Sequence, residues 1–185
     1  MYHRAILSAL IIFGLSACTG YQRPSTAFHE ALTDAYRLDA GDELRVSVYG
    51  QTELTRSYKV DQAGYITMPL INFVPAKGQT TNELESEITK KLSNGYMRNP
   101  DVTVEVATYR PFFIMGEVQN AGQYPYVAGM TAQTAVAIGG GFTSRARQGT
   151  VDVTRQINGE VLTGKVPITD PLRPGDTVFV RERLF

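Results

Sequence analysis

The chain has 185 residues, in which 18 lysines and arginines are balanced by 18 aspartates and glutamates. Without a net charge to attract a phosphate backbone, the composition argues against nucleic-acid binding. A single cysteine excludes an intramolecular disulfide, and 17 glycines, 9 prolines and 10 tyrosines beside no tryptophan are typical of many short strands and turns.

The first 17 residues resemble a bacterial lipoprotein signal peptide. Arg4 provides a short positive start, residues 5–15 are apolar and uncharged, and Leu15-Ser16-Ala17-Cys18 has the order of a lipobox. The apolar run is about half the roughly 20 residues that a membrane-spanning helix needs. We therefore expect cleavage before Cys18 and acylation of that residue. The alternative is an ordinary signal peptide with a cysteine at this place by chance.

The residues from the cysteine onward indicate the membrane in which the lipoprotein resides and a flexible spacer. Thr19 stands where lipoproteins retained in the inner membrane carry an aspartate, so we expect the outer membrane, with the protein facing the periplasm on its acyl chains. Residues 18–35 are polar and show no sustained period, which predicts a flexible spacer. No later stretch approaches membrane-spanning length.

Short strands are expected at the start of the first folded region, residues 36–109. Residues 44–48 alternate between apolar and polar side chains, which predicts a strand with one buried face. Two further strands, at residues 57–60 and 65–68, flank Asp61-Gln62-Ala63-Gly64. Glycine supplies the positive φ that a short turn needs, so this segment predicts a hairpin.

A helix is predicted over residues 82–94. Thr80 and Glu83 have the spacing of a capping box, in which each side chain satisfies the other residue's exposed backbone N–H. Apolar residues then recur every four positions, and Gly95 is a natural stop. The alternating residues 102–106 predict the next strand.

A domain boundary is expected near Arg110, because the proline in Tyr109-Arg110-Pro111 interrupts the strand pattern. Residues 110–185 then repeat the same kinds of element on a smaller scale. In chain order we expect a strand at residues 112–118, a short helix at 132–138 capped by Thr131 and ended by Gly139-Gly140-Gly141, a hairpin at 150–163 that turns on Asn158-Gly159, and a strand at 177–181.

Two distant segments share one pattern, Leu-x-x-Gly-Asp followed by an alternating strand. They are Leu38–Val46 and Leu172–Val180. Glycine adopts a backbone conformation that other residues resist, and an aspartate can hydrogen-bond the turn, so we interpret Asp42 and Asp176 as turn residues. The alternative is a carboxylate pair for acid–base chemistry, but no neighbouring residue suggests that a substrate is activated there.

No catalytic, metal or cofactor site is expected. His3 lies in the signal and His29 in the spacer, so no histidine is available for a nucleophile system or a metal cluster. The glycines at 139–141 follow a helix rather than precede one, which argues against a phosphate cradle. Two carboxylates without histidine could still serve a glycosidase, so a polysaccharide-modifying enzyme remains an alternative.

Aromatic side chains are candidates for stacking on sugar rings, whose apolar faces suit aromatic faces. Alternatively, most of them are core or strand-pair residues. Arg145 and Arg147 could line a channel for an acidic glycan, or belong to a solvated loop. The aromatic candidates are Tyr109, Phe112, Tyr124, Tyr126 and Phe142.

The ordered set of motifs resembles the bacterial outer-membrane polysaccharide export proteins of the Wza type. The segments that resemble the polysaccharide export domain are residues 36–49, residues 60–66, Pro69-Leu70, the capped helix and Asn99–Val104. The segments that resemble a soluble ligand-binding β-grasp (SLBB) domain are Gly116-Glu117-Val118, Gly122–Pro125 and the helix into Ala137–Phe142.

The resemblance implies an α+β protein of two small domains, an export domain at residues 36–109 and a β-grasp domain at 110–185. It implies no enzymatic activity and no cofactor. The expected role is a homo-oligomeric, ring-like conduit or adaptor for capsule polysaccharide or exopolysaccharide, working with an inner-membrane polysaccharide co-polymerase. The alternative is a monomeric lipoprotein whose β-grasp domain binds a glycan or a partner protein without forming a conduit.

One departure from the family pattern concerns the C-terminus. Pore-forming members carry an amphipathic helix after their last β-grasp domain, whereas only residues 182–185 follow the last expected strand here. We therefore expect a short form that needs a separate outer-membrane pore partner. The residues that contact the polysaccharide are not identified by any of these motifs.

Overall fold

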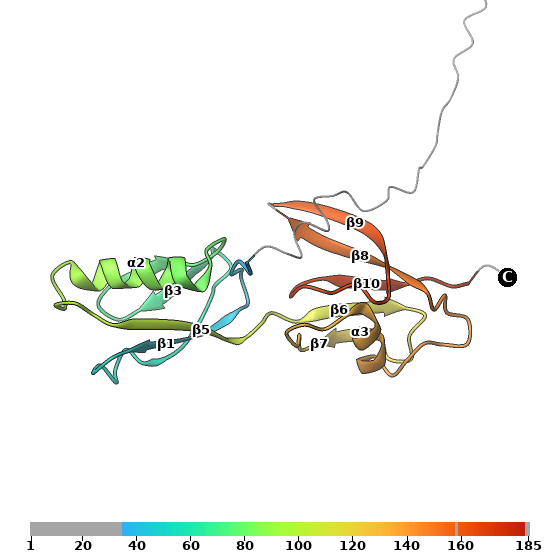
Figure 1. The fold of residues 1–185 in the computed structure, drawn as a ribbon, viewed down its shortest axis with the longest axis horizontal. Coiled ribbons are helices and arrows are strands. Elements are labelled where there is room, and N and C mark those ends of the chain that lie inside the picture. The colour runs from blue at the N-terminus through green and yellow to red at the C-terminus, as the bar shows by residue number, and fades with distance from the viewer. Residues whose placement is uncertain (1–34, 158, 184–185) are drawn as a thin grey trace, which may run out of the picture.

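The computed structural model describes residues 35–157 and 159–183, which form two lobes side by side along the long axis of the molecule (Figure 1). Helices and largely antiparallel sheets occur in both lobes, so the predicted α+β class is confirmed. The segment 35–42, blue in Figure 1, lies where the lobes meet.

The first lobe contains one helix, a three-stranded sheet in the order β2-β1-β5 and a two-stranded sheet of β3 and β4. Its elements are β1 (Glu43–Val48), β2 (Arg56–Lys59), β3 (Tyr65–Met68), β4 (Asn72–Pro75), α2 (Thr81–Ser93) and β5 (Val102–Thr108).

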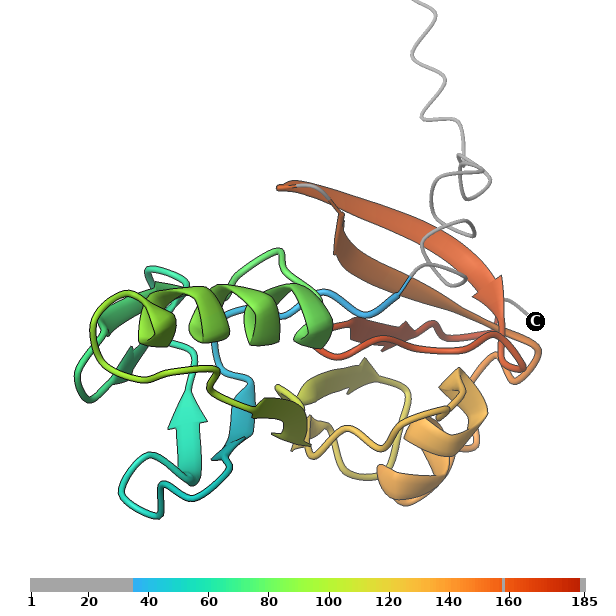
Figure 2. The same ribbon diagram turned by 60° about the vertical axis from the view of Figure 1, so that its left-hand side comes forward.

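The central strand β1 has the alternating pattern that the sequence predicts. Leu44, Val46 and Val48 are buried, whereas Arg45 between them is exposed. β2 and β5 both pair with β1 in the antiparallel sense. The apolar face of this sheet turns toward α2, which lies across the lobe in Figure 2.

The hairpin predicted between β2 and β3 is wrong in its pairing. The turn itself forms, because the N–H of Gly64, at φ 90°, donates to the carbonyl of Asp61. However, β2 pairs with β1, and β3 pairs with β4 in a separate sheet. The carbonyl of Gly64 accepts the N–H groups of Ala76 and Lys77, so the end of β4 closes against this turn.

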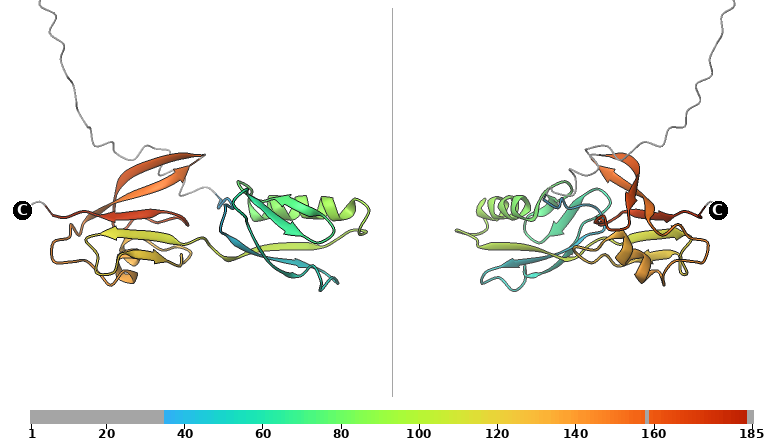
Figure 3. Two further views of the ribbon diagram at one scale, coloured as in Figure 1. Left: turned by 180° about the vertical axis from the view of Figure 1, so that it is seen from behind. Right: turned by 45° about the vertical axis from the view of Figure 1, so that its right-hand side comes forward.

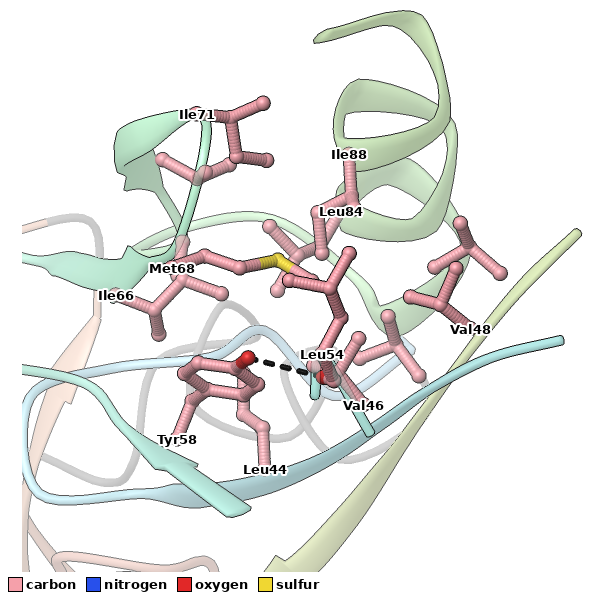
Figure 4. Packing of buried hydrophobic residues seen from close by; sticks show 14 of the residues in the cluster. Leu44, Val46, Val48, Leu54, Tyr58, Ile66, Met68, Ile71, Leu84 and Ile88 are labelled. Atoms are coloured by element: carbon pink, nitrogen blue, oxygen red, sulfur yellow. Dashed lines mark hydrogen bonds between the residues drawn. The ribbon is translucent and has the colours of Figure 1, made fainter. Parts of the chain in front are cut away.

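The helix α2 begins with the predicted capping box. Thr80 Oγ1 accepts the N–H of Glu83 at 3.2 Å, and Glu83 Oε2 accepts the N–H of Thr80 at 2.8 Å. Leu84, Ile88 and Leu92 are fully buried at one-turn spacing. In Figure 4, side chains of α2, β1 and β3 converge in one cluster.

The second lobe is a five-stranded sheet in the order β7-β6-β10-β8-β9 with one short helix. The last strand is parallel to β6 and antiparallel to β8, so it lies in the middle of the sheet. The elements are β6 (Phe112–Gly116), β7 (Gly122–Tyr124), α3 (Ala132–Ile138), β8 (Thr150–Ile157), β9 (Glu160–Pro167) and β10 (Thr177–Val180).

The predicted helix cap and hairpin of the second lobe are confirmed, whereas the strand expected at residues 112–118 ends at Gly116, whose φ is 89°. Thr131 Oγ1 accepts the N–H of Thr134 at 3.3 Å and caps α3, which ends at Gly139. The strands β8 and β9 pair along their whole length as a hairpin, and Gly159 has a φ of 86°. The other predicted turn residue, Asn158, lies outside the described residues.

Each lobe has its own hydrophobic core. One cluster of buried side chains lies between Leu38 and Val104 in the sequence, and the other between Phe112 and Val180. The chain crosses from one to the other between β5 and β6, as both views in Figure 3 show.

Candidate functional site

The repeated Leu-x-x-Gly-Asp segments form the same turn twice, one in each lobe. In the first, the N–H of Asp42 donates to the carbonyl of Asp39 at 3.2 Å, and Asp42 Oδ2 accepts the N–H of Asp39 at 2.9 Å. Asp176 makes the same two bonds with Arg173, at 3.1 and 2.7 Å. The intervening glycines have φ values of 95° and 85°, as type II turns require at the third position. Each carboxylate therefore closes its own turn.

Asp176 is also one half of a buried ion pair. Arg155 donates to both of its carboxylate oxygens, from Nε at 2.9 Å and from Nη2 at 2.6 Å. The two side chains are only 3% and 1% exposed. Such a two-pronged, charge-assisted contact fixes geometry, and removing either partner would leave a buried charge uncompensated. The pair thus joins β8 to the turn that begins β10.

Asp42 has a different set of partners, which reach from the first lobe into the connection between the lobes. Its carboxylate is fully buried and accepts the hydroxyl of Tyr36 at 2.7 Å and the backbone N–H of Arg110 at 2.9 Å. The Arg110 Nη1 donates to the same tyrosine hydroxyl at 3.1 Å and lies 3.6 Å from Asp42 Oδ2. Arg110 is therefore anchored to the turn of the first lobe.

The turn of the second lobe holds the same connection from the other side. The N–H of Gly175 donates to the carbonyl of Pro111 at 3.1 Å, and the N–H of Phe113 donates to the carbonyl of Asp176 at 2.9 Å. A Cβ atom added at Gly175 would lie 2.5 Å from Arg110 Nε. The residues that connect the lobes therefore lie between the two Gly-Asp turns and form hydrogen bonds with both.

A cleft of about 400 Å³ opens at this junction, between the two turns. Both lobes contribute to its walls, including the segment that begins the first lobe and the end of the β8–β9 hairpin. The lining residues with charged side chains are Arg37, Asp39, Lys77, Arg110, Arg155, Arg173 and Asp176.

Asp39 is the carboxylate of the first turn that faces cations in this cleft. Its Oδ1 lies 2.9 Å from Lys77 Nζ, and its Oδ2 lies 3.6 Å from Arg110 Nη1. Partial burial opposes ionisation of Asp39, but the hydrogen bonds from Lys77 and from the Ala40 N–H, with Arg110 nearby, hold its pKa below the usual value. This carboxylate is therefore ionised at neutral pH.

Three tyrosines form a cluster beside the cleft. The ring of Tyr109 meets Tyr36 edge-on at 5.0 Å between centroids and Tyr126 at 5.5 Å. A second cavity of about 240 Å³ is lined by these tyrosines and shares Tyr36, Arg173 and Pro174 with the first. Burial raises the pKa of Tyr36 and of Tyr126, so both are neutral hydrogen-bonding groups.

The aromatic candidates from the sequence divide into two groups. Tyr109 and Tyr126 line the second cavity at the junction. Phe112 is fully buried in the core of the second lobe and stacks on Tyr124, whose hydroxyl donates to the carbonyl of Asn120. Phe142 packs against the same core.

The two arginine candidates do not line the cleft. Arg145 forms ion pairs with Glu117 and Glu182, both at 3.1 Å, and the hydrogen bonds of Thr143 and Arg145 hold the pKa of Glu117 below its usual value. The backbone N–H of Arg147 donates to the carbonyl of Arg181. Both residues lie in the loop between α3 and β8.

Sequence reasoning missed Tyr36 and Arg155. A signal for Arg155 existed, because it occupies an inward position of β8 after Val151 and Val153, where a buried cation requires a carboxylate partner. No local pattern distinguishes Tyr36, whose partners Asp42 and Arg110 come from a turn and from the distant connection between the lobes.

Other predicted features fall outside the structural description. Cys18, His3 and His29 belong to the undescribed N-terminal residues. Among the residues that are described, none of the helices has the length and apolar character to cross a membrane. Within the same ranges, no three His, Cys, Asp or Glu side chains gather in a way that could hold a metal ion.

Comparison with known proteins identifies both halves of the chain. Residues 30–107 match the family described as polysaccharide biosynthesis/export protein, and residues 111–165 match the SLBB domain.

Three curated relatives agree with these matches. The exopolysaccharide production protein ExoF of Rhizobium meliloti is 37% identical over 124 residues, covering 60% of this chain and 30% of ExoF. EpsA of Ralstonia solanacearum, an EPS I polysaccharide export outer membrane protein, is 29% identical over 48% of this chain and 30% of its own. KpsD of Escherichia coli, a polysialic acid transport protein, is 25% identical over 80% of this chain and 28% of its own.

The matched region thus spans less than a third of each relative's length. The two family matches follow one another in the order that the motifs predict. The first contains the first Gly-Asp turn, and the second contains β6 and β8, the strands that pair with β10. With an export domain followed by an SLBB domain, the chain belongs to the polysaccharide export proteins of the Wza type.

Proposed function

We propose that this chain is an outer-membrane lipoprotein that faces the periplasm and guides a capsule polysaccharide or exopolysaccharide through a homo-oligomeric ring. The observation that carries the proposal is the succession of an export domain and an SLBB domain in one chain. We take residues 36–109 and 110–185 as these two domains. The role is transport and not catalysis, since the carboxylates of Asp42 and Asp176 are engaged in holding turns.

The junction between the lobes supports a ring. A closed ring needs subunits that repeat at a constant angle, and a subunit built of two loosely joined parts would not define one. Here the connection is held by Asp42 on one side and by Gly175 and Asp176 on the other. The two lobes would therefore enter an assembly as one unit.

The proposed partners are the polysaccharide itself and an inner-membrane polysaccharide co-polymerase. The names of the relatives support the first of these, because they refer to exopolysaccharide production, polysaccharide export and polysialic acid transport. Transport through a lumen requires release as well as binding, so we expect many weak contacts with the polymer.

Cys18 is the proposed site of lipid attachment. A single acyl chain binds membranes only marginally, whereas two or more hold a protein stably. A Cys18→Ser variant should fractionate as a soluble protein and fail to support export. Ser16→Ala, which keeps a small residue two positions before Cys18, should behave as wild type. Normal export by Cys18→Ser would show that the anchor is dispensable.

Deletion of the gene tests the function as a whole. We expect loss of surface polysaccharide and accumulation of polymer in the periplasm, both reversed by the wild-type gene. The mass of the detergent-extracted protein tests the ring. A monomer at high protein concentration would contradict the conduit and favour a glycan- or partner-binding lipoprotein instead.

A further inference from the structure

The cleft between the two Gly-Asp turns is positively charged in a chain that has no net charge. Five cationic residues line it, namely Arg37, Lys77, Arg110, Arg155 and Arg173, whereas four carboxylates line it or pair with these cations, namely Asp39, Asp176, Glu83 and Asp42. A recess with an excess of one sign concentrates ions of the other sign, since its walls exclude water and focus the field. The cleft is therefore suited to an anionic group.

The cations differ in what they offer to such a group. Arg155 is 3% exposed and donates two hydrogen bonds to Asp176, so its role is to fix the wall of the cleft in place. Arg110 is 21% exposed, and its Nη1 donates to the hydroxyl of Tyr36 and lies 3.6 Å from a carboxylate oxygen of both Asp39 and Asp42. Its Nε lies against Gly175, and its Nη2 has no hydrogen-bond acceptor among the described residues. Lys77 is about half exposed, and its ammonium group pairs with Asp39.

The tyrosine cluster adds an apolar surface beside these donors. Tyr36 lines both cavities, together with Arg173 and Pro174, so the aromatic and the cationic parts are continuous. Sugars with a carboxylate need both kinds of contact, because the ring stacks on an aromatic face and the carboxylate pairs with a guanidinium or ammonium group. A neutral sugar would leave the cationic excess unused.

We propose that this junction binds one carboxylate-bearing sugar residue of the transported polymer, with the carboxylate at Arg110 and Lys77 and the sugar ring along the tyrosine cluster. The volume of about 400 Å³ is within the range of small-molecule sites. Asp39 competes with the ligand for the same two cations, which keeps the binding weak. This inference rests on the proposed function and names the class of glycan.

The test is calorimetric titration of the full chain, purified in detergent, with tetragalacturonate and with its methyl ester, which keeps the sugar rings and removes the charge. We expect the acid to bind at least about tenfold more tightly than the ester, because a hydrogen bond between charged partners contributes about one decade in affinity. Added salt should weaken only the binding of the acid.

Two variants with opposite expected effects locate the site. Lys77→Gln should weaken binding of the acid several-fold, whereas Asp39→Asn, which removes the competing carboxylate, should strengthen it. Lys90→Gln is the matched control, because Lys90 is an exposed lysine on α2 that does not line the cleft. All three positions are at least partly exposed, so the variants are expected to fold.

The outcomes separate this inference from the proposed function. Equal binding of acid and ester, or an equal loss in Lys77→Gln and Lys90→Gln, would overturn the assignment of an acidic sugar to this cleft. Either result would leave the export function intact. Unimpaired surface polysaccharide in the deletion strain would instead refute the export function, whatever the titrations show.

Discussion

The side chain of Arg110 lies against Gly175 so closely that a Cβ atom there would come within 2.5 Å of Arg110 Nε. The two residues belong to different parts of the molecule, because Arg110 connects the lobes and Gly175 is the third residue of the second Gly-Asp turn. Two constraints therefore favour glycine at this position. Its φ is 85°, and the Arg110 side chain occupies the space that a Cβ atom would need.

Gly175→Ala should lower the free energy of unfolding by roughly 1–2 kcal/mol, the cost of a side chain at positive φ, and should displace Arg110 in addition. Gly50→Ala is the matched control, because Gly50 has a φ of 72° with no atom within 4 Å of the added Cβ. Urea denaturation of both variants measures the difference. A smaller loss at Gly175 than at Gly50 would contradict the contact with Arg110.

Gly116→Ala should be more damaging than either. A Cβ atom at Gly116 would lie 2.2 Å from the carbonyl oxygen of Val180, a backbone atom of the parallel β6–β10 pair that cannot rotate away. The positive φ costs roughly 1–2 kcal/mol and overpacking about 1–3 kcal/mol more. We expect a strongly lowered melting temperature. A variant as stable as Gly50→Ala would show that β6 and β10 are not paired as described.

Asp176→Asn should destabilise the protein by about 3–5 kcal/mol, because it removes the carboxylate that binds the buried guanidinium of Arg155 through two hydrogen bonds. Asp101→Asn, at an exposed position before β5, should change the stability little. Chemical denaturation measures both effects.

A double-mutant cycle tests the interaction between Arg155 and Asp176 directly. If Arg155 and Asp176 stabilise one another, Arg155→Met combined with Asp176→Asn should cost less than the sum of the two single changes. Strict additivity of the three free energies would mean that the two side chains do not interact.

Thr80→Ala should lower the stability by about 1 kcal/mol, since it removes the acceptor for the Glu83 N–H at the start of α2. Thr80→Ser keeps the hydroxyl and should retain most of the stability. The comparison by thermal denaturation separates the hydrogen bond from the methyl group, and equal losses in the two variants would argue against the capping box.

The interactions of Asp39 lead us to expect that the stability of the folded protein depends on pH in the acid range. Its pKa in the folded protein lies below the ordinary value of 3.8, so the unfolded chain takes up the proton at a higher pH than the folded one. The stability that ionised Asp39 contributes is present above about pH 4 and is lost as the pH falls through the lower folded-state pKa. Asp39→Asn should therefore be less stable than wild type at about pH 6, with a gap that narrows below about pH 4. A gap that stays constant with pH would exclude this ion pair as its cause.

Features that depend on neighbours a few residues apart were predictable. The capping box of α2, the alternation of β1, the cap of α3 and the β8–β9 hairpin all follow from spacing within one element. The β2–β3 hairpin failed for a related reason. The sequence around Gly64 forms a turn, but a turn does not determine which strands pair. In the structure β3 pairs with β4, and β2 pairs with β1.

The sequence by itself determined the two Gly-Asp turns, the order of the domains and the family to which the chain belongs. Only the tertiary structure decided that these turns face one another across Arg110 and enclose a cationic cleft. The bonds of Arg110 to Asp42 and Tyr36 join residues 68 and 74 positions apart. Such contacts leave no periodic trace in the chain, because they depend on how two separately packed cores come together.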